Sequence, residues 1–145
     1  ALAKRPRWRI MARRVEGAAR VIERLALVAG GAAAGAVARY LVGLWAAERL
    51  GVAFPWGTLL VNVSGSFALT FLVVLTTERL GMGPGVRLLL GTGVCGGYTT
   101  FSSFALETLA LVEERAVGAA VLYVVASVGL SLLAGLAGVW CARLS

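Results

Sequence analysis

The chain has 145 residues, of which 59% are hydrophobic and only 14% are charged, and its mean hydropathy is +0.87. This composition excludes an ordinary water-soluble domain and indicates a membrane protein. The sequence contains no His and no Asp, so it lacks the usual general base and the usual transition-metal ligands, which argues against an enzyme. Its two cysteines, Cys95 and Cys141, lie in apolar segments and are too few for a disulfide framework or a zinc site.

The formal net charge of +7 is concentrated at the N-terminus. Residues 1–24 contain eight Lys or Arg against two Glu, which accounts for +6 of the total. Base-stacking aromatic residues are nearly absent there apart from Trp8, so nucleic-acid binding is not expected. We predict a basic cytoplasmic-type tail over residues 1–24, held near anionic lipid, and a transmembrane domain over residues 25–145. Met11 is an alternative start, which would leave four basic residues in the tail.

Four apolar segments follow the tail, at residues 25–47, 56–77, 86–112 and 116–142. Each is long enough to cross about 30 Å of hydrocarbon as a helix. Gly31 and Gly35 in the first segment, and Gly135 and Gly138 in the fourth, have the spacing of small residues in closely packed helices. The sequence therefore predicts an all-α membrane protein with four transmembrane helices per subunit.

The third segment differs from a plain spanning helix at its centre, which reads GTGVCGGYTTFSSF from Gly91 to Phe104. It matches GxGxxG by coincidence, because a dinucleotide site needs a preceding strand and a soluble βαβ unit. Gly96, Gly97 and the threonine pair that follows Tyr98 weaken the helix, so we predict an interruption at mid-membrane depth. The freed backbone groups must then find partners inside the protein or bind an ion. A merely kinked helix is the alternative.

Two stripes of polar side chains run along other apolar segments. Residues four apart drift by about 40° around a helix, so each stripe forms one slowly winding face. Because polar groups facing lipid are unfavourable, we expect these faces to turn toward a partner helix or a hydrated path. Neutral hydroxyl and amide donors with no carboxylate among them suit an anion. The stripes consist of Thr58, Asn62, Ser66 and Thr70 in the second segment and of Tyr123, Ser127 and Ser131 in the fourth.

Aromatic and acidic residues follow the predicted interruption. Phe101 and Phe104 are three residues apart and would share a helical face, where the electropositive edges of two rings can line a narrow anion site. The alternative is that both rings face lipid or the core. Glu107, one turn further along, is either a proton or cation site or an interfacial residue near the end of the span.

Taken together, three motifs resemble the bacterial fluoride channel family, Fluc, also called CrcB. They are GGAAAGAVARY at residues 30–40, GTLLVNVSGSF at 57–67 and GGYTTFSSFALE at 96–107. The resemblance implies a fluoride-selective channel that passively exports fluoride from the cytoplasm across the plasma or inner membrane. It also implies an antiparallel, dual-topology homodimer with two pores along the subunit boundary.

The resemblance further implies a set of site residues. Backbone carbonyls at Gly96 and Thr99 would hold a structural sodium ion that is not transported. The anion path would be lined by Asn62, Phe101, Ser103, Phe104, Tyr123, Ser127 and Ser131. Arg39, Glu107, Thr58 and Ser66 would occupy a vestibule or secondary positions.

The basic tail departs from the family pattern. Eight basic residues at one end favour insertion in a single, N-inside orientation, whereas an antiparallel homodimer needs both orientations in equal number. An oppositely oriented homologue is therefore the alternative partner.

Two other functions compete with the channel. A small dual-topology, proton-coupled multidrug exporter needs a carboxylate inside the membrane, and Glu107 is its one candidate. A non-transporting membrane assembly subunit would need only the small-residue seams, but it would leave the polar stripes and the interrupted helix unexplained.

Overall fold

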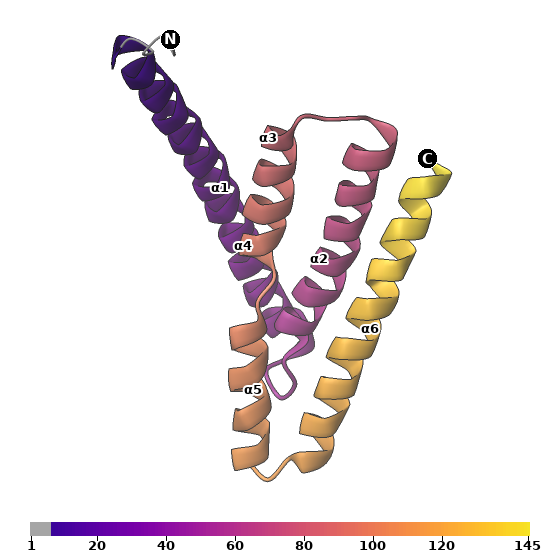
Figure 1. Ribbon diagram of the computed structural model, residues 1–145. Coiled ribbons are helices and arrows are strands. Elements are labelled where there is room, and N and C mark those ends of the chain that lie inside the picture. Colours follow the sequence, from indigo (N-terminus) through magenta and orange to yellow (C-terminus); the bar gives the residue numbers. More distant parts are fainter. Residues whose placement is uncertain (1–6) are drawn as a thin grey trace.

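The computed structural model describes residues 7–145, with side chains from Glu16 onward, and this part of the chain consists of helices and loops (Figure 1). Helix α1 covers Arg7–Leu50, and α2 covers Trp56–Val74 and continues as a π-helical turn, η1, over Leu75–Arg79. The third arm comprises α3 (Pro84–Arg87), the π-helical η2 (Leu88–Cys95), α4 (Gly96–Tyr98) and α5 (Phe101–Glu113). Helix α6, Val117–Leu144, completes the fold. The predicted all-α class is confirmed.

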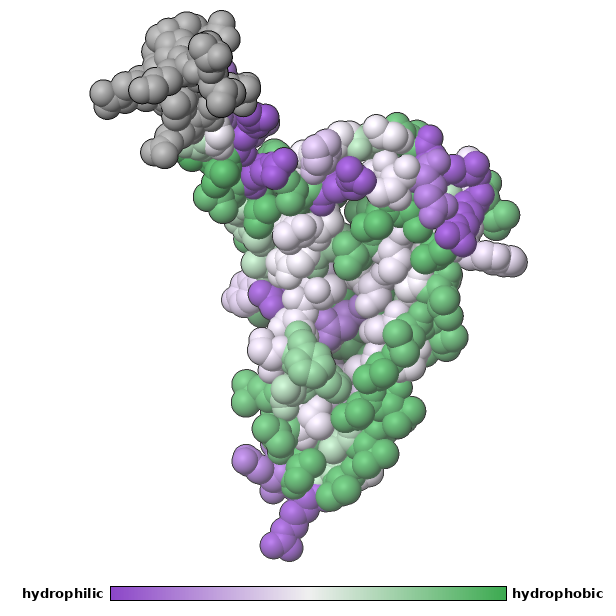
Figure 2. Space-filling view, in the orientation of Figure 1, coloured by the Kyte–Doolittle hydropathy of each residue, from purple (hydrophilic) through white to green (hydrophobic). Residues whose placement is uncertain are grey.

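Within the residues that the structure describes, three stretches are long and apolar enough to cross a membrane, namely Glu16–Leu50, Trp56–Arg79 and Val117–Leu144. Hydrophobic side chains cover much of the visible surface between two hydrophilic ends, as expected for a surface that faces lipid (Figure 2). These features are those of a multi-pass membrane protein. Residues 7–24 of the predicted basic tail belong to helix α1. Most of the basic side chains of the tail lie outside the described residues.

The third arm is interrupted at Thr99 and Thr100. Their backbones are extended, with φ −79° and ψ 156° at Thr99 and φ −152° and ψ 118° at Thr100. The predicted break in the helix is therefore present, and the kinked-helix alternative is wrong. Its mid-membrane depth stays a prediction. Gly96 and Gly97 remain helical in α4, so the interruption lies at the threonine pair and not at the glycine pair. The Thr100 hydroxyl accepts the N–H of Ser103 at 3.2 Å and so caps the new helix α5.

The upper half of the third arm packs directly on the backbone of α1. A Cβ atom added to Gly31 would lie 2.9 Å from the Cα of Gly93, and one added to Gly97 would lie 2.8 Å from the Cα of Ala32. Only hydrogen fits at these positions, and the close packing predicted for the first segment is confirmed. The seam fixes α4, and with it the start of the break, against α1.

Helices α2 and α6 lie side by side (Figure 1). A Cβ atom on Gly138 would lie 3.1 Å from the backbone nitrogen of Phe71, and the hydroxyl of Thr70 donates to the carbonyl of Gly135 at 2.8 Å. The small residues of the fourth segment therefore bring the two helices that carry the polar stripes into contact, as their spacing predicts.

Candidate functional site

Asn62 of α2 holds the break through two hydrogen bonds. Its Nδ2 donates to the carbonyl oxygen of Thr100 at 3.0 Å, and the Thr100 N–H donates to its Oδ1 at 2.8 Å. One amide side chain therefore pairs both backbone groups of an extended residue. The hydroxyl of Ser66 donates to the main-chain carbonyl of Asn62 at 2.7 Å, so it does not compete for the Asn62 side chain.

The carbonyl groups of residues 96–99 lose their usual helical donors at the break, and those of Gly96 and Thr99 are among them. In a continuous α-helix, the Gly96 carbonyl would accept from the Thr100 N–H, and the Thr99 carbonyl would accept from the Ser103 N–H. The Thr100 N–H donates to Asn62 instead, and the Ser103 N–H donates to the Thr100 hydroxyl. Gly96 is also exposed at the surface of the chain. Carbonyl oxygens of unwound backbone are typical ligands of hard cations such as sodium, so Gly96 and Thr99 fit such an ion.

A cavity of about 340 Å³ lies between α2, the break and α6. Parts of the two polar stripes meet there, namely Asn62 and Ser66 of α2 and Ser127 and Ser131 of α6. The Ser127 hydroxyl is buried and has no hydrogen-bond partner within the part of the chain that the structure describes. A buried donor of this kind can bind a ligand that enters the cavity. The polar and aromatic lining consists of Asn62, Ser66, Thr99, Thr100, Phe101, Phe104, Ser127 and Ser131.

Phe101 and Phe104 form the aromatic wall of this cavity. Their ring centroids lie 5.4 Å apart, so the two rings share a side of α5 as their spacing predicts. Phe104 is 9% exposed and packs against Tyr123 with a centroid distance of 5.2 Å. Phe101 is 78% exposed. A single chain therefore covers one ring and leaves the other open.

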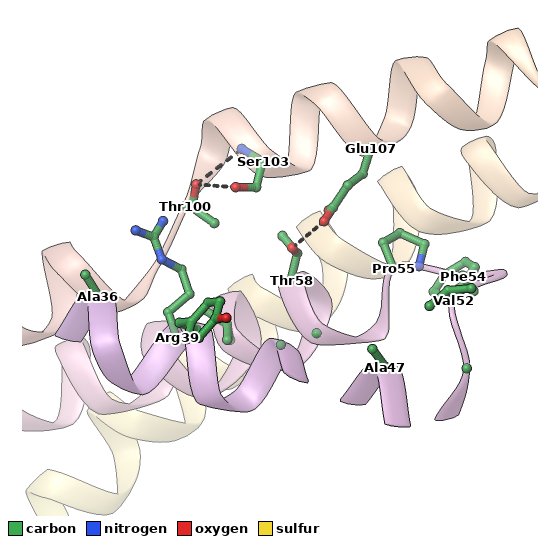
Figure 3. Close-up of a pocket in the computed structure, with 15 residues that line it drawn as sticks. Ala36, Arg39, Ala47, Val52, Phe54, Pro55, Thr58, Thr100, Ser103 and Glu107 are labelled. Carbon is green, nitrogen blue, oxygen red and sulfur yellow. Dashed lines mark hydrogen bonds between the residues drawn. The ribbon is translucent and has the colours of Figure 1, made fainter. Parts of the chain in front are cut away.

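A second cavity, of about 490 Å³, lies between α1, α2 and α5 (Figure 3). Arg39, Thr58, Ser103 and Glu107 line it, and Figure 3 shows the Arg39 guanidinium group pointing toward the side of Thr100 and Ser103. Thr100 lines both cavities. The break therefore forms a wall common to the two cavities.

Glu107 has both carboxylate oxygens engaged. The Thr58 hydroxyl donates to Oε1 at 2.8 Å, and the Tyr123 hydroxyl donates to Oε2 at 2.7 Å. The carboxylate thus connects α2, α5 and α6 at the wall of the larger cavity. A proton or cation site and an interfacial residue near the end of the span both stay predictions for Glu107.

Residues 26–139 match a protein family described as CrcB-like protein, Camphor Resistance (CrcB). The chain belongs to this family. It is 54% identical over 112 residues to the fluoride-specific ion channel FluC of Rhizobium meliloti (strain 1021), which covers 77% of this chain and 90% of the relative. It is 49% identical over 119 residues to the protein of that name from Agrobacterium fabrum, covering 82% and 95% of the two chains. It is 52% identical over 113 residues to the protein of that name from Roseiflexus sp. (strain RS-1), covering 78% of this chain and 88% of the relative.

In this CrcB-family protein, the structure groups the polar stripes differently from their linear order. Tyr123 is fully buried and binds Glu107, so it lines neither cavity, whereas Ser127 and Ser131 line the smaller one. Thr70 likewise lines neither cavity and binds the backbone of α6. Four-residue spacing identifies a face but cannot show which of its members reach a given cavity.

Two residues that shape the break of this CrcB-family chain, one in it and one on α2 facing it, were not among the predicted site residues. Thr100 pairs with Asn62, caps α5 and separates the cavities, and its position in the TT pair was the available signal. Gly65 lines the smaller cavity, and a Cβ atom there would lie 3.1 Å from the Tyr98 ring. Its absent side chain lets the break approach α2.

Proposed function

We propose that this CrcB-family protein is a fluoride-selective ion channel, not an enzyme, and that fluoride passes through the two cavities beside the broken helix. The observation that carries the proposal is the smaller cavity, where neutral donors of two helices meet around the unpartnered Ser127 hydroxyl. Relatives about 50% identical to the chain are named fluoride-specific ion channels.

The chemistry of the lining suits a small, strongly hydrated anion. Hydroxyl donors from Ser127 and Ser131 and the electropositive edges of Phe101 and Phe104 replace water around fluoride. We further propose that the path, once its open side is closed, is narrow enough to disfavour the larger chloride ion. Glu107, the acidic residue in the lining, has both oxygens bound to hydroxyl groups, which reduces its repulsion of an anion. These features support conduction of fluoride over chloride.

Passive conduction is sufficient for export. Hydrogen fluoride crosses membranes as a neutral molecule and dissociates inside the cell. An inside-negative potential then drives the fluoride anion out through a pore. The protein would therefore lower cytoplasmic fluoride without coupling to another ion, from a location in the plasma or inner membrane.

The channel is proposed to be an antiparallel, dual-topology homodimer of four-span subunits, in which the α3–α5 arm is the third, interrupted span. The exposed Phe101 ring supports this assembly, because a second copy would close the open side of the cavity. An oppositely oriented homologue is the alternative partner, since the basic tail favours one orientation. Accessibility labelling of a terminal tag tests this point: both orientations support the homodimer, and a single orientation contradicts it.

A sodium ion bound to the Gly96 and Thr99 carbonyls is part of the proposal. It would supply fixed positive charge next to the anion path, and it would stay in place during conduction. The loss of the helical donors to these carbonyls supports the assignment.

Purified protein in liposomes loaded with potassium fluoride tests the function. With valinomycin present to carry the balancing charge, a fluoride-selective electrode should record rapid release that needs no proton gradient. Uptake of a lipophilic cation driven by a proton gradient would instead identify the multidrug exporter. Inertness in both assays would favour the non-transporting assembly subunit.

A further inference from the structure

We propose that Asn62 is a positioning residue for the cation site: it holds the Thr100 N–H and thereby keeps the Gly96 carbonyl free to bind sodium. This inference rests on the proposed function, in which Gly96 and Thr99 are cation ligands and Asn62 is otherwise only a lining residue of the anion path.

The competing structure is a closed helix. Only Thr99 and Thr100 separate α4 from α5, so a change of these two residues from extended to helical backbone would return the Thr100 N–H to the Gly96 carbonyl. The Gly96 carbonyl oxygen would then accept a helical hydrogen bond and would no longer be free to bind a cation. Asn62 opposes this closure because its Oδ1 accepts the same N–H at 2.8 Å.

The amide opposes closure through a second bond as well, because Asn62 Nδ2 donates to the Thr100 carbonyl at 3.0 Å. Closure would return the N–H groups of residues 100–103 to the carbonyls of residues 96–99, but it would break both bonds of the Asn62 amide. The amide is carried by α2, which approaches the break closely at Gly65. A side chain on a rigid neighbouring helix therefore determines the state of the break.

This arrangement also limits what Asn62 can give an anion. With Oδ1 and one amide hydrogen bound to Thr100, one N–H of the side chain remains for the cavity. The lining role predicted from the sequence is thus reduced, and Asn62 connects the anion path to the cation site through the backbone of the break.

The test measures sodium binding directly. The melting temperature of the purified full-length protein is recorded against sodium chloride, with N-methylglucamine chloride holding ionic strength constant. A fit of the stabilisation to RT ln(1 + [Na+]/Kd) gives the half-saturating sodium concentration of the site. Asn62→Leu keeps the side-chain volume and removes both hydrogen bonds. We expect it to raise the half-saturating sodium concentration by about tenfold, the effect of roughly one hydrogen bond. If Asn62→Leu does not purify folded, Asn62→Ala replaces it.

Ser66→Ala is the matched control. Ser66 lines the same cavity one turn along α2, and its hydroxyl donates to the Asn62 main chain, not to the break. Removing it should leave the half-saturating sodium concentration unchanged, even if fluoride flux falls.

A backbone substitution separates competition from general damage. An α-hydroxy acid in place of Thr100 removes the N–H that would close the helix. In that background Asn62→Leu should change the half-saturating sodium concentration less than twofold, because the Gly96 carbonyl has no competing donor. An equal effect of Asn62→Leu in both backgrounds would overturn the proposal.

Two further outcomes would also overturn it. One is an Asn62→Leu variant that conducts less fluoride but binds sodium as the wild type does, which would make Asn62 a lining residue only. The other is a wild-type melting temperature that does not respond to sodium. In both cases, wild-type fluoride release in liposomes would leave the proposed channel function intact, so the two failures are distinguishable.

Discussion

The hydroxyl of Tyr123 donates to the carboxylate of Glu107 across 2.7 Å, from α6 to α5. The other oxygen of that carboxylate accepts the Thr58 hydroxyl of α2 at 2.8 Å. One acidic residue inside an otherwise apolar bundle is thus satisfied by two hydroxyl groups, and three helices meet at it. The two serines one and two turns beyond Tyr123 are left to line the smaller cavity.

Removing the carboxylate should therefore destabilise the bundle more than removing either hydroxyl. Tyr123→Phe removes one hydrogen bond and should lower the free energy of unfolding by about 1 kcal/mol, whereas Glu107→Ala removes both and should lower it by about 2 kcal/mol. Reversible unfolding in a detergent–SDS titration measures both values. Equal losses for the two variants would show that only one of the bonds matters.

Ser127→Ala should reduce conduction without reducing stability. The Ser127 hydroxyl has no partner within the described chain, so its removal breaks no internal hydrogen bond. We expect fluoride release to slow by about tenfold, the effect of one lost donor, and the midpoint of unfolding to stay the same or rise. A variant that unfolds more easily yet conducts at the wild-type rate would assign the hydroxyl a structural role.

Phe104→Ile should slow fluoride release while the protein keeps its oligomeric state. The substitution removes an aromatic edge from the cavity and the contact with Tyr123. The energy of such an aromatic contact corresponds to a decrease in the release rate of up to about tenfold. Leu106→Ala is the control, because Leu106 lies on the same helix, is 71% exposed and does not line the cavity. Size-exclusion chromatography with light scattering follows the assembly. Equal losses of flux in the two variants would contradict a specific role for the ring.

Two adjacent glycines of α1 should respond in opposite directions. A Cβ atom on Gly30 meets nothing within 4 Å, so Gly30→Ala should stabilise the helix by up to about 1 kcal/mol. On Gly31 it would collide with the backbone of η2, so Gly31→Ala should destabilise the protein by about 1–3 kcal/mol. The free energy of unfolding of both variants tests the seam. Similar effects would mean that α1 and η2 are not in close contact.

The sequence predicted best those features that depend on residues close together in the chain. Apolar length gave the helices, and small-residue spacing gave the seam at Gly31. The position of the break was less certain, because glycines are poor helix formers in general, yet here Gly97 remains helical to admit Ala32. The threonines interrupt the helix because Thr100 caps α5 and binds Asn62.

Pairings between distant segments could not be predicted from spacing. Thr100 lies 38 residues from Asn62, and Glu107 lies 49 residues from Thr58. Which polar residue of a stripe meets a carboxylate, a backbone group or a cavity depends on how the helices are staggered. Small-residue spacing predicts that a helix packs closely, but it does not show which residues of the neighbouring helix lie opposite the glycines, so the stagger cannot be read from the spacing. For the same reason Tyr123 was expected in the anion path and lies instead against Glu107.

The central claim is that the cavity beside the broken helix selects fluoride from other halides. Its most direct test compares release of fluoride and of chloride from liposomes that contain the same amount of protein, with valinomycin and a potassium gradient providing the driving force. Rapid release of fluoride with chloride retained at the level of protein-free liposomes is the predicted result. Comparable release of both ions, or retention of both, would contradict it.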